Sequence, residues 1–130
     1  MENQKNIIKS VRDLNVYQKA FDSAMAIYEF SKKFPAEEKY SLTDQIRRSS
    51  RSVCSNLSEA WRLRKYKAAF IHKLTDCSQE ASETQTWLEF ALKRKYIDNN
   101  IFEEMDEQYE HIFAMLITME RKADSFCKEN

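Results

Sequence analysis

Apolar residues recur at intervals of three and four along most of this 130-residue chain, the spacing of one face of an α-helix. A first helix is predicted to begin near Asn15, because Asn15 and Gln18 have the spacing of a capping box. It ends before Pro35, and residues 34–40 are predicted to form a loop. The apolar positions of this helix are Tyr17, Phe21, Ala24, Ile27, Tyr28 and Phe34.

A second helix is predicted to start at Ser41, with Asp44 as its capping partner. Its apolar stripe consists of Leu42, Ile46, Val53, Leu57, Ala60 and Trp61. No Gly, Pro, Ser, Thr, Asn or Asp follows Trp61 before Ile71 to mark the end of this helix. Since one continuous helix over residues 41–95 would be roughly 80 Å long, we place a turn near residues 64–67.

Two further helices complete the pattern. The third carries Phe70, Leu74, Cys77, Ala81, Thr84, Leu88 and Ala91. The fourth starts at Asn100 as the cap, with Glu103 as its partner. It carries Phe102, Met105, Tyr109, Ile112, Leu116, Met119, Ala123 and Phe126. Such stripes are typical of helix seams. The sequence therefore predicts an all-α fold, an up-down-up-down four-helix bundle forming a single domain over residues 1–130, with residues 1–12 as a flexible N-terminal segment.

The chain contains no glycine, although glycine makes up about 7% of an average protein. This composition excludes the Gly-rich phosphate loops of nucleotide-binding folds and the G-x-S-x-G elbow of hydrolases. It also disfavours tight β-hairpins, which rely on glycine in their turns.

The side chains that support catalysis or metal binding are sparse and scattered. Cys54, Cys77 and Cys127 are widely spaced, and reduced thiols packed as small apolar residues are the expected interpretation. Neither His72 nor His111 belongs to the Glu-x-x-His pair of di-metal bundles. The serines around residue 50 have no His or Asp at a recognisable spacing, so close helix packing explains them better than catalysis. We therefore expect no enzyme activity, no catalytic residue, no cofactor and no metal.

Location follows from the apolar runs. The longest run, residues 112–117, is far shorter than the ~20 residues that span a bilayer. The polar N-terminus does not resemble a signal peptide. We expect a cytoplasmic protein with no membrane role.

The net charge is zero, from 21 basic and 21 acidic side chains, but the charges are segregated. Residues 41–73 carry 8 basic and 2 acidic side chains, a net of +6, whereas residues 74–130 carry 6 basic and 13 acidic ones, a net of −7. The chain is thus neutral as a whole and polarised along its length.

Several stretches resemble one family in order and spacing. They are residues 13–20 (DLNVYQKA), Phe34-Pro35 followed by Glu38 and residues 40–42, then residues 45–49 (QIRRS), 52–60 (SVCSNLSEA) and 82–88 (SETQTWL). Over roughly residues 13–120 the chain resembles the four helix bundle protein family, first noticed in intervening sequences within bacterial 23S rRNA genes, some members of which were labelled ribosomal proteins.

The resemblance implies a bundle that assembles into rings, commonly pentameric, without established enzymatic activity. It also suggests kinship with the basic, nucleic-acid-binding accessory proteins of diversity-generating retroelements, which act beside a reverse transcriptase. One departure is that the family pattern places Gly near the second turn, where this chain has Ala60-Trp61-Arg62.

A basic stripe marks the second helix. Arg47, Arg51, Ser55, Ser58, Arg62 and Lys65 fall within roughly 80° of one another at 100° per residue, on the side expected to face outward. Guanidinium forks and serine hydroxyls suit phosphate oxygens. The candidate nucleic-acid-binding residues are Arg47, Arg48, Arg51, Arg62 and Lys65. The alternative is an ordinary solvated helix face.

An acidic face on the fourth helix is the counterpart of this stripe. Its members are Glu103, Asp106, Glu107 and Glu110. In an up-down bundle the second and fourth helices are diagonal, so these charges can pair only between subunits, in the head-to-tail manner that closes rings.

The best functional interpretation is a non-enzymatic adaptor that binds the backbone of RNA or DNA and acts as a homo-oligomeric ring. The alternative is a structural scaffold for protein partners that uses the same charged faces. The large aromatic side chains could stack on bases, although packing in the core or an interface explains them better. They are Trp61, Trp87, Tyr96 and Tyr109.

Overall fold

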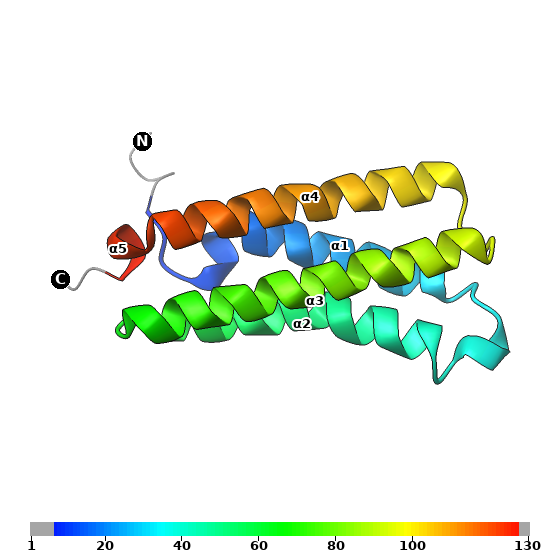
Figure 1. Cartoon of the computed structure of the whole chain (residues 1–130), viewed down its shortest axis with the longest axis horizontal. Coiled ribbons are helices and arrows are strands. Elements are labelled where there is room, and N and C mark those ends of the chain that lie inside the picture. Colours follow the sequence, from blue (N-terminus) through cyan, green and yellow to red (C-terminus); the bar gives the residue numbers. More distant parts are fainter. Residues whose placement is uncertain (1–6, 128–130) are drawn as a thin grey trace.

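The computed structural model describes residues 7–127, and these form a helical bundle without strands (Figure 1). The helices are α1 (Asn15–Ser31), α2 (Leu42–Arg62), α3 (Lys67–Lys93), α4 (Asn99–Arg121) and the short α5 (Ala123–Phe126). Short 3₁₀ turns precede α1 and α2, at Val11–Asp13 and Ala36–Glu38. The prediction of an all-α bundle is confirmed.

Each of the four long helices packs against two others, so that the helices occupy the corners of a square bundle. α2 lies between α1 and α3, and α4 also contacts both of these helices. Within residues 7–127, α2 and α4 share no contact, so they lie diagonally across the bundle. The most extensive helix contact is between α2 and α3, whose ribbons overlap in the left half of Figure 1 and separate toward the start of α2.

The predicted apolar stripes of α2 and α3 are buried in full. On α4 the stripe is buried from Met105 to Met119, and Phe102 at its start is half-buried. The predicted fourth helix breaks at Lys122, so the last two positions of its stripe, the buried Ala123 and the half-buried Phe126, lie on α5. The apolar positions of α1 are not all buried. Its buried face consists mainly of small residues, and several of its larger side chains lie beside that face. The buried residues of α1 are Val16, Ala20, Ser23, Ala24, Ile27 and Ser31. Phe21, predicted to face the core, is 46% exposed instead.

The start of α1 differs from the predicted capping box. The N-cap is Leu14, which has no side-chain acceptor, and Gln18 donates its Nε2–H to the Arg12 carbonyl at 2.9 Å instead of capping. The capping box belongs to the preceding 3₁₀ turn, where Ser10 and Asp13 satisfy each other's backbone amides. The predicted flexible segment, residues 1–12, therefore includes part of a folded turn, and its residues 1–6 lie outside the described residues.

The capping interactions of α2 and α4 also differ from those predicted, although Ser41 is the N-cap residue of α2 as predicted. Ser41 makes no side-chain cap; the Glu38 carboxylate accepts the Leu42 amide at 3.2 Å from one turn earlier. At α4 the cap is Asp98, whose carboxylate accepts the Ile101 amide at 2.8 Å, rather than Asn100. Both corrections replace a short polar side chain with a carboxylate, whose charge favours the positive end of a helix.

The turns between the helices are formed without glycine. α2 ends at Arg62 and α3 begins at Lys67, which agrees with the predicted turn near residues 64–67. The C-cap Leu63 keeps a negative φ of −95°. Among the described residues, the only positive φ is 64° at Lys95, after α3. There the Tyr96 and Lys95 amides donate to the Ala91 and Leu92 carbonyls, which is a Schellman motif with lysine in the usual glycine position.

We predict that Lys95→Gly stabilises the protein. A left-handed conformation costs a residue with a Cβ roughly 1–2 kcal/mol, part of which glycine's larger unfolded-state entropy offsets. The expected gain is about 0.5–1 kcal/mol in the free energy of unfolding, measured by urea denaturation. Glu89→Gly, at an exposed position inside α3, should lower stability instead. If both substitutions changed the free energy of unfolding equally, the left-handed conformation of Lys95 would not be the cause.

We also predict that Glu38→Gln destabilises the protein by about 1 kcal/mol near neutral pH, the usual cost of a lost cap. Hydrogen bonds from the hydroxyls of Ser41 and Tyr96, and from the Leu42 amide, hold the pKa of Glu38 below its ordinary value of 4.5. The stabilisation is therefore complete above the unfolded-state pKa and is lost as pH falls through the folded-state pKa.

Urea denaturation at several pH values checks this prediction. The difference between wild type and Glu38→Gln should narrow as the pH falls below about 4.5. The neighbouring exposed Glu37 provides a matched control, since Glu37→Gln should change little at any pH. A constant difference across the pH range would show that the charge of Glu38 is not what caps α2.

Candidate nucleic-acid interface

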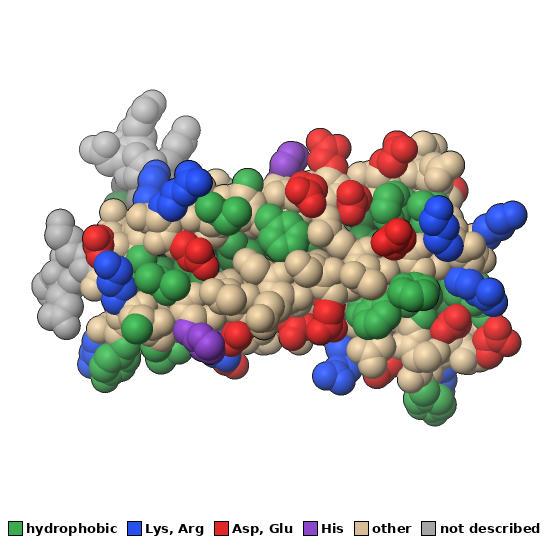
Figure 2. Space-filling view, viewed as in Figure 1, with side chains coloured by type: hydrophobic (Ala, Val, Ile, Leu, Met, Phe, Trp, Pro, Cys, Tyr) green, Lys and Arg blue, Asp and Glu red, His purple; other side chains and the backbone are tan. Residues whose placement is uncertain are grey.

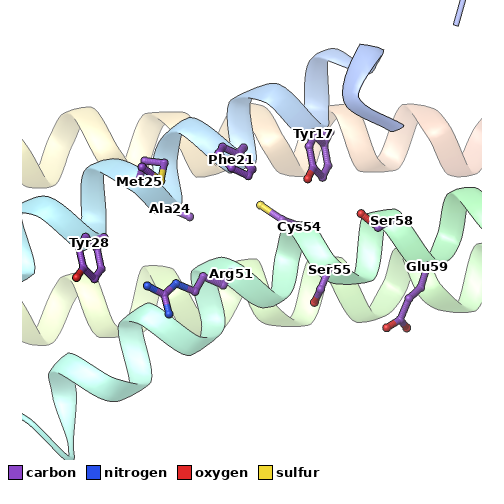
Figure 3. A pocket seen from close by; sticks show the side chains of 10 residues that line it. All are labelled: Tyr17, Phe21, Ala24, Met25, Tyr28, Arg51, Cys54, Ser55, Ser58 and Glu59. Carbon is purple, nitrogen blue, oxygen red and sulfur yellow. The ribbon is translucent and has the colours of Figure 1, made fainter. Parts of the chain in front are cut away.

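A groove of about 750 Å³ lies between α1 and α2 (Figure 3). α1 contributes mainly aromatic and apolar side chains, and α2 contributes short polar side chains and one arginine. The lining residues are Tyr17, Phe21, Ala24, Met25, Tyr28, Arg51, Cys54, Ser55, Ser58 and Glu59. Figure 3 shows Arg51 reaching toward Tyr28 across the groove, whereas Glu59 points away from α1.

The α1 wall of the groove is an unburied apolar stripe. Tyr17, Phe21, Met25 and Tyr28 follow one another at spacings of four and three, one residue after the buried stripe. Phe21 is 46% and Met25 52% exposed, and the rings of Tyr17 and Phe21 lie 5.9 Å apart. Large apolar side chains gathered at one exposed site mark an interaction surface more often than a scattered few do.

Two arginines lie around Tyr28 at one end of the groove (Figure 3). The Arg47 guanidinium lies 4.4 Å and that of Arg51 5.4 Å from the centre of the Tyr28 ring, which places both within cation–π range. Arg47 also donates its Nε–H to Ser31 Oγ at 2.8 Å, so this side chain links α2 to α1. Arg51 makes no such hydrogen bond within the described residues and remains exposed.

The other end of the groove is basic. Arg62 is exposed there, and the Arg64 guanidinium stacks 3.6 Å from the Trp61 ring centre while its Nε–H donates to the Trp61 carbonyl at 2.7 Å. The 3₁₀ turn before α1 adds Lys9 and Arg12 to the same end. Trp61 itself is only 6% exposed and is part of the core.

The predicted basic residues are thus divided between two sides of α2. Arg51 lines the groove and Arg62 lies at its basic end, together with Ser55 and Ser58. Arg47 does not point outward as predicted, because Tyr28 and Ser31 of α1 hold it. Arg48 lies toward α3: burial raises the pKa of Glu80 on that helix, and the charge of Arg48 opposes the rise. Lys65 is exposed in the turn between α2 and α3, outside the groove.

The acidic face lies on α4, where acidic side chains gather over the N-terminal half of the helix (Figure 2). Gln85 of α3 donates its Nε2–H groups to Asp106 at 3.0 Å and to Glu110 at 2.9 Å. Glu107 Oε2 lies 3.9 Å from His111 Nε2. Glu103 is exposed. Among residues 7–127, no lysine or arginine pairs with this acidic face.

The remaining chemistry-bearing side chains are accounted for by packing. Burial raises the pKa of Cys54 to about 11 and that of Cys77 to about 12, so both thiols are protonated near neutral pH. No group of three His, Cys, Asp or Glu side chains in the described part of the chain is arranged to hold a metal. None of the helices over residues 7–127 has the length and apolar character needed to span a bilayer.

Two of the four large aromatic side chains considered for base stacking are unavailable, since Tyr109 and Trp61 are buried in the core. Trp87 and Tyr96 are half-buried, and the Tyr96 hydroxyl donates to Glu38. The aromatic residues that line the groove instead belong to α1. In the sequence, the apolar residues of α1 cover a wider stripe than one buried helix face needs. Which of them are buried and which line the groove depends on how α1 packs in the bundle, so the sequence alone could not separate them.

Comparisons with known proteins place this fold in a family. A family model described as 23S rRNA-intervening sequence protein matches residues 12–118. No curated protein matches the chain. A solved structure from Bacteroides thetaiotaomicron VPI-5482, described as a protein with unknown function from the S23 ribosomal protein family, is 31% identical and aligns with a TM-score of 0.74. The alignment covers 82% of this chain and 95% of that one. Because the family model spans most of the helical bundle, the chain belongs to the 23S rRNA-intervening sequence protein family, as the sequence resemblance predicted.

Proposed function

We propose that this protein is a non-enzymatic adaptor that binds single-stranded RNA or DNA along the groove between α1 and α2. The observation that carries the proposal is the combination of exposed aromatic side chains on one wall and uncompensated arginines on or beside the other. Proteins that bind single strands without sequence preference combine these two elements, a basic groove for the backbone and aromatic faces for the bases.

The α2 wall supplies the backbone contacts in this proposal. Arg51 and Arg62 are eleven residues apart on one helix, which corresponds to about 16 Å at 1.5 Å per residue. Ser55 and Ser58 lie between them; the Ser58 hydroxyl can donate to a phosphate oxygen, whereas the Ser55 hydroxyl donates to the Ser52 carbonyl at 3.3 Å. Arg48 and Lys65, outside the groove, contribute only long-range attraction.

The α1 wall supplies stacking. Phe21 exposes nearly half of its surface beside the half-buried Tyr17, so a base can lie against either ring. Stacking on an aromatic side chain contributes about 1–3 kcal/mol per base and tolerates any sequence. No base-reading motif accompanies the groove, so binding depends on charge and shape.

We predict that binding weakens linearly in log K against log salt, with a slope of about 0.7 per neutralised phosphate. Filter binding of a single-stranded RNA across a salt series measures this slope. Arg51→Ala and Arg62→Ala should each reduce it by roughly 0.7. Lys33→Ala, an exposed lysine outside the groove, should leave the slope unchanged. Absence of binding at low salt would refute the nucleic-acid proposal.

The same groove also fits the alternative function, a scaffold for protein partners. Met25 is 52% exposed, and methionine is common on surfaces that accommodate varied helical partners. Binding to a helical partner would depend far less on salt, so the salt series distinguishes the two functions.

We further propose that the protein works in the cytoplasm as an up-down-up-down bundle assembled into a ring. The order of packed neighbours and the short connections support that topology. Membership of the family supports a pentamer and, more distantly, a reverse transcriptase as a partner. The acidic face of α4 would meet the exposed basic side chains that lie outside the groove, Arg48 of α2 and Lys65 of the following turn, in the next copy, because α2 and α4 are diagonal within one subunit and cannot neutralise each other.

We predict that Glu103→Gln combined with Glu107→Gln shifts the protein toward smaller species. Both side chains are exposed, so the substitutions remove charge without disturbing the core. Multi-angle light scattering at low salt measures the change. Glu83→Gln combined with Glu89→Gln removes two exposed charges from α3 and should leave the mass unchanged. A wild-type monomer at low salt would rule out assembly through these charges.

A further inference from the structure

A second cavity, of about 310 Å³, continues the groove at its basic end. The two cavities share Tyr17 and Ser58 in their walls. Four cationic side chains line the second cavity, namely Lys9, Arg12, Arg62 and Arg64. The remaining lining residues are Ser10, Val11, Tyr17, Ser58 and Trp61, so no carboxylate lines it.

The four cations come from two segments that are distant in the sequence. Arg12 belongs to the 3₁₀ turn and Lys9 directly precedes its cap Ser10; the capping box and the bond from the Lys9 amide to Asp13 fix the backbone around both residues. Arg62 ends α2 and Arg64 follows it in the turn. Arg64 is fixed by its Nε hydrogen bond and its stacking on Trp61, which leaves its two terminal amino groups as donors.

These charges are not neutralised within the described part of the chain. None of the four cations has a carboxylate within 4.0 Å there. The nearby Asp13 accepts the backbone amides of Lys9 and Ser10, and these bonds lower the pKa of its carboxyl. The charge of Lys9 also lowers the pKa of Asp13, so this carboxylate offsets part of the charge of Lys9, but Asp13 does not line the cavity. Ser10 Oγ accepts the Arg12 amide, so its proton remains available to a ligand.

We propose that this cavity binds the terminal phosphate of a single strand that lies in the adjoining groove. A terminal phosphate carries about −1.5 to −2 charges and three acceptor oxygens, which suits a cavity with several cations and hydroxyl donors. Guanidinium groups bind phosphate bidentately, and three of the four cations are arginines. This inference rests on the proposed function, because the strand must occupy the groove for its end to reach the cavity.

The test compares three versions of one single-stranded RNA about ten nucleotides long, within the site sizes typical of single-strand binders. One carries a 5′-phosphate, one a 3′-phosphate and one has hydroxyls at both ends, each with an internal fluorophore for anisotropy. We expect one of the two phosphorylated strands to bind about tenfold more tightly than the hydroxyl strand. In Lys9→Ala and Arg12→Ala this preference should disappear, while the hydroxyl strand still binds.

Lys33→Ala is the matched control and should retain the preference. Circular dichroism establishes that each variant is folded. Equal affinity for all three strands would overturn the terminal-phosphate site while leaving the adaptor function intact. Failure of every strand to bind at low salt would overturn both. If inorganic phosphate competes as well as the phosphorylated strand does and the strand's own terminal phosphate adds no affinity, the cavity takes free phosphate and the inference is wrong.

Discussion

Close packing between α2 and α3 is the interaction on which the rest of the bundle depends. Ser49 Oγ and Thr84 Oγ1 lie 2.8 Å apart at this contact, and both side chains are buried. Ala81 and Cys77 are small, fully buried neighbours on α3. Small side chains let two helix backbones approach, and the hydroxyl pair satisfies polar atoms that would otherwise be costly to bury. α2 is thereby fixed against α3.

The contact of α2 with α1 is of a different kind. Here Tyr28 lies beside the guanidinium groups of Arg47 and Arg51, and bulky side chains fill the space between the helices only in part. The two arginines belong to the same basic stripe of α2 but differ in role, since Arg47 links α2 to α1 and Arg51 remains exposed. A groove exists because α2 has a close neighbour on one side and a more distant one on the other.

The sequence predicted the helices and their buried faces well wherever the apolar residues of one helix fall on a single face. The stripes of α2 and α3 are such cases, because apolar residues at a period near 3.6 have only one face to bury. The prediction for α1 was wrong at Phe21, since that helix buries small residues and leaves larger ones exposed. Ser41 is the N-cap residue of α2 as predicted, but the carboxylate that caps the helix is that of Glu38 in the preceding turn, and at α4 the cap is Asp98 rather than Asn100. Lys9 and Arg12 meet Arg62 through packing alone, which no local pattern reveals.

The separation of charge between α2 and α4 has a kinetic consequence. A protein with no net charge experiences no uniform attraction toward a polyanion, yet diagonal helices of opposite sign give each subunit an electric dipole. If the protein binds nucleic acid as proposed, a nearby strand would rotate a subunit before contact, turning the groove toward the strand and the acidic helix away from it. Such orientation raises the fraction of productive encounters. It acts within about a Debye length, roughly 8 Å at physiological ionic strength.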